Sequence, residues 1–338
     1  MKKFGRSYKN IITVENLLRA WQEFLSGKKN RIDVAAFQNR LMNNICDLHQ
    51  ELADKTYRHG EYHAFNISDP KPRNIHKATV RDRLLHHLLH AEMYPHFDKK
   101  FIHDSYSCRI GKGTHKAMDR FKDFGRTVSK NDTRVCWVLK CDIRKFFANI
   151  HHVILKDIIA RHIEDRDLLD LLGHIIDSFS TQGRTDVGLP LGNLTSQLLV
   201  NVYMNEFDHF MKRTLKVTHY IRYADDFAIL SEDRDYLANL IPQIAEFLGD
   251  RLKLSLHPNK VFVKTLGSGV DFLGWVHFPH HRVLRTATKR RMFANPGIYA
   301  ADEAVVNSYR GLLSHGNGWK LVRMIEAVSA KGSSPEIG

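Results

Sequence analysis

The sequence is poor in cysteine and has no long apolar segment. Its four cysteines, at positions 46, 108, 136 and 141, are scattered over 338 residues, which is too sparse for a disulfide framework and typical of a reducing compartment. No run of about 18 apolar residues occurs, the length that a membrane-spanning helix needs, and no apolar signal core follows the basic start. These absences predict free thiols, a cytoplasmic location and no membrane partner.

Acidic residues are in the minority. Lys and Arg number 51 against 37 Asp and Glu, which leaves a formal net charge of +14 at pH 7. Such an excess favours binding to phosphate backbones, because binding releases the counterions held by the polymer. Many basic proteins bind nucleic acid without acting on it. The composition therefore indicates a nucleic-acid partner and does not by itself indicate an enzyme.

Metal-binding and nucleotide-binding motifs of the common kinds are missing. The 21 histidines include pairs at 86–87, 151–152 and 280–281, but none has a Cys-x-x-Cys or His-Glu-x-x-His companion. The segment Gly111-Lys-Gly113 lacks the Gly-x-x-x-x-Gly-Lys-Ser/Thr frame of a phosphate-binding loop. We therefore predict neither a structural zinc site nor a Walker-type nucleotidase.

Three carboxylates stand out against this background. In Tyr220-Ile-Arg-Tyr-Ala-Asp-Asp-Phe-Ala-Ile-Leu230, aromatic and β-branched residues on both sides predict a hairpin with Asp225 and Asp226 at its tip. A mostly apolar strand predicted over 134–142 ends at Asp142. If the strands are neighbours, the acids cluster and repel unless cations neutralise them. Oxygen ligands suit Mg²⁺, and two such ions about 3.5–4 Å apart support nucleotidyl transfer.

These segments resemble the motifs of reverse transcriptases, with Tyr-Ala-Asp-Asp at 223–226 and Asp-Ile-Arg-Lys-Phe-Phe at 142–147. Four further segments resemble family motifs in the family's order: Lys71-Pro-Arg-Asn-Ile75, Arg81-Asp-Arg83, 104–113 and Val270-Asp-Phe-Leu-Gly-Trp275. The resemblance extends from about residue 70 to 318. It implies an RNA-directed DNA polymerase of the α+β class, shaped as a right hand whose antiparallel palm sheet is backed by helices.

The resemblance also implies a division of the chain. The expected parts are an N-terminal helical element at 1–60, fingers at 61–133, a palm with finger insertions at 134–278 and a small helical thumb at 279–338. Helical spacing of apolar residues predicts helices within 13–25, 31–57 and 79–97, and an extended segment over 62–75. In the palm we expect helices at 151–163, 166–179, 193–213 and 234–249, and in the thumb at 302–313 and 319–328.

One segment narrows the resemblance to a subgroup of the reverse transcriptases. Gly188-Leu-Pro-Leu-Gly-Asn-Leu-Thr-Ser-Gln197 stands where most reverse transcriptases carry Gln-Gly-x-x-x-Ser-Pro. This variant resembles the enzymes of diversity-generating retroelements, which are related to group II intron reverse transcriptases. The resemblance implies copying of a template-repeat RNA into cDNA with errors at adenine. Leu191 replaces a polar glutamine, and we expect the lost polar contact to weaken discrimination; an ordinary core leucine is the alternative.

The resemblance assigns roles to the acids and to one aromatic residue. Asp142 and Asp225 would ligate both Mg²⁺ ions, helped by the backbone carbonyl of Ile143, while Asp226 would support them at the primer end. Phe147 would exclude the 2′-hydroxyl of a ribonucleotide. A core phenylalanine is the alternative for that residue.

Further residues are candidates for holding the substrates. Basic side chains bind phosphate through charge-assisted hydrogen bonds, so the dNTP-binding candidates, besides Phe147 and Leu191, are Lys71, Arg73, Arg81, Arg83 and Lys260. Arg81 and Arg83 could instead pair with acids on helix surfaces. The candidates for template and primer contacts are Lys112, Gln197, Tyr223, Leu273, Gly274 and Trp275. The last three would form a tight turn whose aromatic ring offers the primer a flat wall.

Two other functions stay open from the sequence. A reverse transcriptase of a phage-defence or domesticated group II intron-like system would share the chemistry, and a catalytically silent nucleic-acid-binding scaffold would share only the fold. The three acids argue against the scaffold, because without cations nothing favours their clustering. The partners implied are template RNA, the cDNA product, dNTPs and a small basic helical accessory protein, which we expect RNA to bridge because both proteins are basic.

Overall fold

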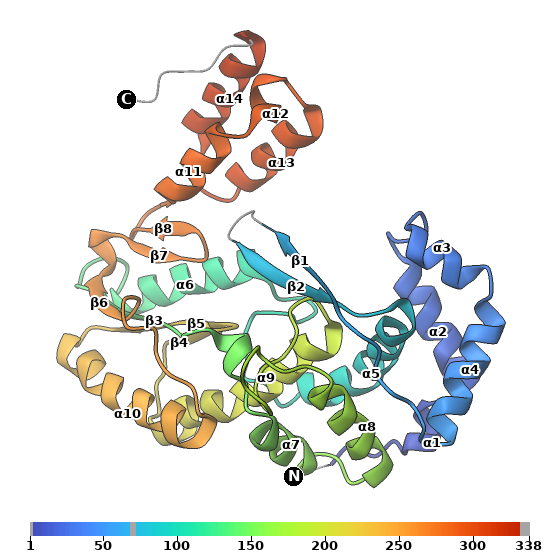
Figure 1. Cartoon of the computed structure of the whole chain (residues 1–338). Coiled ribbons are helices and arrows are strands. Elements are labelled where there is room, and N and C mark those ends of the chain that lie inside the picture. Colours follow the sequence, from blue (N-terminus) through green and yellow to red (C-terminus); the bar gives the residue numbers. More distant parts are fainter. Residues whose placement is uncertain (1–2, 68–71, 332–338) are drawn as a thin grey trace. The chain divides into compact units, whose positions relative to one another are not determined.

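A computed structural model describes residues 3–67 and 72–331 (Figure 1). Lys71, a predicted nucleotide-binding residue, lies outside the described residues. The chain divides into two compact units, each built from separate stretches of the sequence. Unit 1 comprises Met1–Arg109, Ile143–Lys216 and Gln243–His257, and unit 2 comprises Ile110–Asp142, Val217–Pro242 and Pro258–Gly338.

Unit 1 is mainly helical. Its helices are α1 (Tyr8–Ile11), α2 (Val14–Leu25), α3 (Ile32–Gln38), α4 (Leu41–Ala53), α5 (Val80–Asp98), α7 (His152–Ala160), α8 (Arg166–Asp177) and α9 (Leu194–His209), with short helical turns at Phe146–Asn149 and Phe210–Thr214. One antiparallel hairpin joins β1 (His63–Ile67) to β2 (Arg73–Lys77). Helix α10 (Arg234–Leu252) begins in unit 2 and ends in unit 1.

Helix α5 is a central packing element of unit 1. It begins after Thr79, whose side chain accepts a hydrogen bond from the backbone N–H of Asp82, a standard N-cap. Its leucines 84, 85, 88 and 89 are all buried, and the helix packs against α2 and α9. Each such leucine contributes about 1.5–3 kcal/mol through burial. A helix that is apolar on several faces is expected to lie inside a domain.

Unit 2 contains two antiparallel sheets. The larger one has the strand order β4 (Tyr220–Tyr223), β5 (Asp226–Ser231), β3 (Trp137–Asp142), β6 (Phe262–Thr265). Helix α6 (Thr114–Val128) packs on β4 and β5, and the interior residues of β3 and β5 are buried without alternation. Strands covered on both faces have such continuous apolar runs, so this sheet lies within the core.

The second sheet of unit 2 leads into a helical segment. It consists of β7 (Val270–Phe272), β8 (Trp275–His277) and β9 (Arg282–Leu284), and the short turn Leu266–Ser268 precedes it. The helices that follow are α11 (Thr286–Phe293), α12 (Pro296–Tyr299), α13 (Glu303–Leu313) and α14 (Trp319–Lys331). Apolar residues of α6, β8, β9 and all four helices form one cluster.

The structure confirms most of the elements expected from the sequence. The α+β class, the antiparallel sheets and the hairpin around the paired acids are present as predicted. One difference lies in 31–57, where the single expected helix is two helices, α3 and α4, separated at Asn39–Arg40. The division into fingers, palm and thumb stays a prediction. Among the described residues, no helix has both the length and the apolar character that crossing a membrane requires.

Candidate active site

A tight hairpin positions two of the three predicted acids. Tyr223 and Asp226 are paired residues of β4 and β5, so Ala224 and Asp225 alone make the turn. Ala224 has a positive φ of 55°, as the first residue of such a two-residue turn requires. The buried Arg222 guanidinium donates a hydrogen bond of 3.0 Å to the Ala224 carbonyl. The turn therefore places Asp225 at the hairpin tip and Asp226 at the start of β5.

The third acid lies on the neighbouring strand. Asp142 is the last residue of β3 and stands directly opposite Asp226 in the antiparallel register. The prediction that strand pairing brings the three acids together is therefore confirmed. Asp142, Asp225 and Asp226 are all partly buried, and Asp225 directly precedes Asp226 in the hairpin turn.

The environment of these acids disfavours negative charge. Burial and the neighbouring Asp142 raise the pKa of Asp225 above its ordinary value. Burial, with smaller contributions from Asp225 and Asp142, raises the pKa of Asp226 to about 6, although Lys140 opposes the shift. Raised carboxylate pKa values are expected where like charges share a desolvated site. A divalent cation would relieve this repulsion.

Two lysines contact the acids. Lys140, on β3 and only 6% exposed, forms an ion pair with Asp226. Lys260 lies 3.1 Å from both carboxylate oxygens of Asp142. Lys140 was not among the predicted site residues, although a lysine inside an otherwise apolar strand is a signal in the sequence for such a role. Lys260 was a candidate for binding the dNTP, and in the structure its ammonium contacts Asp142, a predicted metal ligand.

The donor set fits hard divalent cations. Three carboxylates at a strand end and the adjoining hairpin offer the oxygen ligands that Mg²⁺ prefers. The raised pKa values of Asp225 and Asp226 indicate that the site disfavours uncompensated charge. Ile143, whose carbonyl was expected to help, directly follows Asp142 in the sequence. It is buried, and its backbone forms a β-bridge with Leu256.

In unit 1, three segments that carry predicted nucleotide-binding residues are joined by backbone hydrogen bonds. The Leu189 N–H donates to the Phe147 carbonyl over 2.9 Å, and the His76 N–H of β2 donates to the Leu191 carbonyl over 3.0 Å. The side chains of Phe147 and Leu191 are both partly exposed. The role of each side chain stays a prediction. Arg73, at the start of β2, is exposed.

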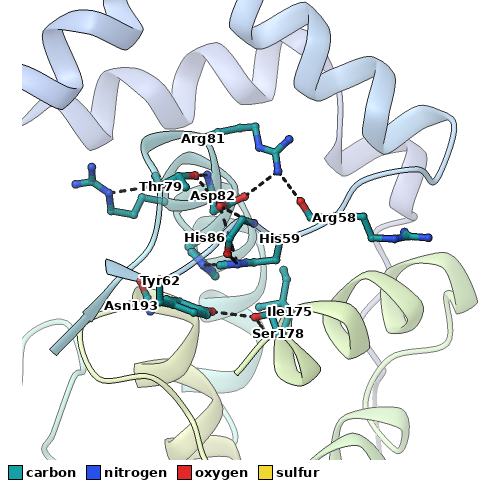
Figure 2. A network of polar contacts seen from close by, with 12 residues as sticks. Arg58, His59, Tyr62, Thr79, Arg81, Asp82, His86, Ile175, Ser178 and Asn193 are labelled. Carbon is teal, nitrogen blue, oxygen red and sulfur yellow. Dashed lines mark hydrogen bonds and ion pairs between the residues drawn. The ribbon is translucent and has the colours of Figure 1, made fainter. Parts of the chain in front are cut away.

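Arg81 and Arg83 are held by carboxylates of unit 1. Arg81 makes two hydrogen bonds to Glu51, of 2.7 and 2.9 Å, and Figure 2 shows its guanidinium also reaching the Arg58 carbonyl and Asp82. Arg83 contacts Asp33 at 2.6 Å. The structure thus gives both arginines the ion-pair role that the sequence had left open, and Arg73 is the better candidate for holding a triphosphate.

The buried centre of this network is Asp82, which is fully shielded from solvent. Its carboxylate accepts hydrogen bonds from Tyr57 Oη at 2.8 Å, from the Gly60 N–H at 3.0 Å and from Thr79 Oγ1 at 2.6 Å. Burial alone would raise the pKa of Asp82, but the hydrogen bonds from Thr79 and Tyr57, with the neighbouring His59 and Arg81, lower it. Asp82 is a structural acid that joins the start of α5 to the segment before β1 (Figure 2).

The residues expected to contact template and primer differ in their surroundings. Tyr223 accepts a hydrogen bond of 3.1 Å from Thr114 Oγ1, at the start of α6. Lys112 lies just before that helix and is partly buried, and Gln197 is a partly buried residue of α9.

The turn at Leu273 and Gly274 is confirmed, because both residues have positive φ, 54° and 87°, between paired strands. The expectation for Trp275 was wrong. Its ring is 2% exposed and packs in the core of unit 2, since the strand turns it inward against the helices that follow. It cannot offer a flat wall to a primer.

Comparison with protein families decides the assignment. Residues 67–277, more than half of the chain, match the family model described as "Reverse transcriptase (RNA-dependent DNA polymerase)". The chain belongs to the reverse transcriptase family. The matched region includes all three acids, the three segments that carry Arg73, Phe147 and Leu191, and the turn before Trp275.

Relatives of this reverse transcriptase include intron-encoded proteins. It is 26% identical over 262 residues to Protein YkfC of Escherichia coli strain K12, covering 66% of each chain. It is 22% identical over 366 residues to the group II intron-encoded protein LtrA of Lactococcus lactis subsp. cremoris, covering 85% of this chain and 58% of LtrA. The chain therefore spans about three fifths to two thirds of the length of these relatives.

Solved structures support the same fold. The apo telomerase of Candida tropicalis, truncated from its C-terminal domain, aligns with a TM-score of 0.50 at 11% identity, covering 70% of this chain and 59% of that one. At this identity the likeness concerns the fold alone. It agrees with an α+β polymerase of the right-hand type.

Proposed function

We propose that the protein is an RNA-directed DNA polymerase that extends a primer on an RNA template by nucleotidyl transfer. The observation that carries the proposal is the register of β3 and β5, which sets Asp142 opposite Asp226 and beside the hairpin tip that bears Asp225. Family membership makes template RNA, dNTPs and a cDNA product the natural substrates and product, and the charge of +14 supports polynucleotide binding.

In this proposal Asp142 and Asp225 hold two Mg²⁺ ions, with the Ile143 carbonyl as a further ligand and Asp226 in support. Bound Mg²⁺ supplies charge stabilisation for the attacking and leaving oxygens of an in-line displacement. The chain itself fixes the carboxylates, because Asp142 and Asp226 sit at the ends of buried strands and Asp225 lies in the tight turn between β4 and β5. Lys140 and Lys260 balance the charge of Asp226 and Asp142.

Primer extension on RNA with dNTPs and Mg²⁺ tests the activity. Replacing Asp225 by Asn should lower the rate by about 10²–10³-fold, since metal-ion stabilisation of the transition state contributes several kcal/mol. Asp123→Asn, an exposed acid on α6 of the same unit, is the matched control and should extend normally. Absence of extension on every template by the unmodified protein would favour the silent scaffold instead.

The nucleotide pocket is proposed to include Phe147, Leu191 and Arg73, with Lys71 as a candidate from the sequence alone. The Phe147 carbonyl accepts a hydrogen bond of 2.9 Å from the Leu189 N–H, and the Leu191 carbonyl accepts one of 3.0 Å from strand β2. The three segments therefore share one framework. Phe147→Ala should admit ribonucleotides, because the ring would otherwise collide with the 2′-hydroxyl. Unchanged selectivity for dNTP over rNTP would contradict the assignment.

We further propose that the template is a repeat RNA of a diversity-generating retroelement, copied with errors at adenine. The support is the segment 188–197 and the partly exposed Leu191 within it. An apolar side chain there removes a polar contact that discriminates base pairs. Leu191→Gln should lower the error frequency opposite adenine, read by sequencing cDNA, while Leu189→Met, a buried neighbour, serves as control. Equal adenine errors in wild type and Leu191→Gln would remove Leu191 as a cause.

The similarity to group II intron-encoded LtrA favours a second candidate, a domesticated intron-like or phage-defence reverse transcriptase. Sequencing the RNA that copurifies with the protein separates the two, because a template-repeat RNA is expected only for the first. A small basic helical accessory protein is part of the first proposal. We expect the complex of the two proteins to dissociate when it is treated with nuclease at high salt. A complex that survives this treatment would mean that the two proteins contact each other directly.

A further inference from the structure

A second group of ligand-type side chains lies in unit 1, apart from the polymerase acids in the sequence. His152 is the first residue of α7, Asp177 is the last residue of α8, and Asp186 belongs to the loop that follows α8. One ligand atom from each residue lies within 4.8 Å of the others. His152 is 1% exposed, whereas the two acids are exposed. The group is thus open to solvent on its acidic side and closed on its imidazole side.

The hydrogen bonding of His152 leaves one ring nitrogen available. Its Nε2 lies 2.7 Å from the Gly188 carbonyl, which can only accept, so Nε2 carries the proton. Its Nδ1 is buried and has no hydrogen-bond partner among the described residues. That nitrogen points at Asp177, with 3.3 Å between Nδ1 and Oδ1. A buried polar nitrogen without a hydrogen-bond partner is costly.

We propose that His152 Nδ1, Asp177 Oδ1 and a carboxylate oxygen of Asp186 bind a divalent cation of the zinc type. Two ligands at about 2.0–2.1 Å from a tetrahedral Zn²⁺ lie about 3.3–3.4 Å apart, and the distance from Nδ1 to Oδ1 is 3.3 Å. An imidazole ligand favours Zn²⁺ or Co²⁺ over Mg²⁺, which takes oxygen ligands in octahedral geometry. The remaining coordination position is left for water.

The surroundings match those of metal-bound histidines and carboxylates. Such a histidine usually donates its other N–H to a carbonyl or carboxylate, which fixes the ring, and Gly188 supplies that carbonyl. The other oxygen of Asp177 is held by Lys156, so Oδ1 stays directed at His152. No sequence motif indicates this site, because its three residues come from two helix ends and a loop.

The ion would fasten the loop after α8 to the start of α7. The His152 N–H donates to the Asp186 carbonyl at 2.9 Å, and the Gly188 N–H donates to the Ile150 carbonyl at 2.7 Å. A metal bound by side chains of His152 and Asp186 would add a further link to this junction. The site is therefore structural, and it does not depend on the proposed function.

Metal titration of the whole protein tests the proposal. Protein stripped with chelator is titrated with Co²⁺ in excess Mg²⁺, which occupies hard oxygen sites, and binding is read from visible absorption and equilibrium dialysis. We expect one Co²⁺ per chain, displaced by Zn²⁺. Asp177→Asn and Asp186→Asn should each weaken it at least 100-fold, and both variants should fold because both side chains are exposed.

Two controls decide the location. Asp170→Asn, an exposed acid on the same helix as Asp177, should bind Co²⁺ as the wild type does. Asp225→Asn should also retain it, which separates this site from the polymerase acids. The proposal is overturned if the wild-type protein takes up no Co²⁺ in excess Mg²⁺, or if Asp177→Asn and Asp186→Asn bind it as tightly as Asp170→Asn.

Discussion

Replacing Asp226 by Asn should stabilise the metal-free protein while impairing the polymerase. Burial raises the pKa of this carboxyl from 3.8 to about 6, so ionising it costs more in the folded chain than in the unfolded chain. Asn has nearly the shape of the protonated acid and cannot ionise. At about 1.4 kcal/mol per pKa unit, a shift of about two units makes wild type less stable than the variant by about 3 kcal/mol well above pH 6.

The sign of the pH dependence follows from the direction of the shift. Because the folded pKa of Asp226 is raised, its stabilising effect is complete below the unfolded value of 3.8 and is lost as the pH rises through about 6. The advantage of Asp226→Asn should therefore be small at pH 4, larger at pH 5 and about 3 kcal/mol at pH 8.

Urea unfolding in EDTA at these three pH values measures the difference directly, with Asp123→Asn as the exposed-acid control. Added Mg²⁺ should raise the stability of wild type more than that of the variant, since binding to the folded state stabilises it. A variant no more stable than wild type at pH 8 in EDTA, or an advantage that does not change with pH, would refute the reasoning.

Two further substitutions test the framework of unit 1. Asp82→Asn places an amide against the hydroxyl donors of Tyr57 and Thr79. The loss of charge-assisted bonds should lower the free energy of unfolding in urea by about 3 kcal/mol. A loss below about 1 kcal/mol would show that the network is not stabilising. Gly188→Ala adds a Cβ 2.3 Å from Thr181 Oγ1 at a φ of +112°. The melting temperature should therefore fall by several degrees. An unchanged melting temperature would mean that the loop relaxes freely.

The sequence was sufficient for the features set by local pattern. The hairpin that bears Asp225 and Asp226 follows from aromatic and β-branched residues on both sides of a short polar turn, and the strand ending at Asp142 follows from its apolar run. Their adjacency needed only the assumption that the two strands pair. The roles of these residues in binding metal stay predictions.

Features that depend on pairing between distant residues could not be read from the sequence. Arg81 and Arg83 looked like phosphate-binding residues, but Glu51 and Asp33 lie within reach only after folding. Lys140 and Asp226 are 86 residues apart. The direction of the Trp275 ring depends on the helices that follow it, because an aromatic residue at a strand start has the same local pattern whether it faces solvent or core.

The interleaving of the two units constrains how the protein can be made and dissected. Unit 1 draws on three stretches of sequence and is complete only when residue 257 has been synthesised. The first 109 residues therefore belong to a unit whose other parts are encoded far downstream. Truncation of the chain before residue 257 should leave this unit incomplete. Dividing the gene at a single point cannot separate the units, because the chain passes between them several times. A circularly permuted or split protein would have to keep each of these connections.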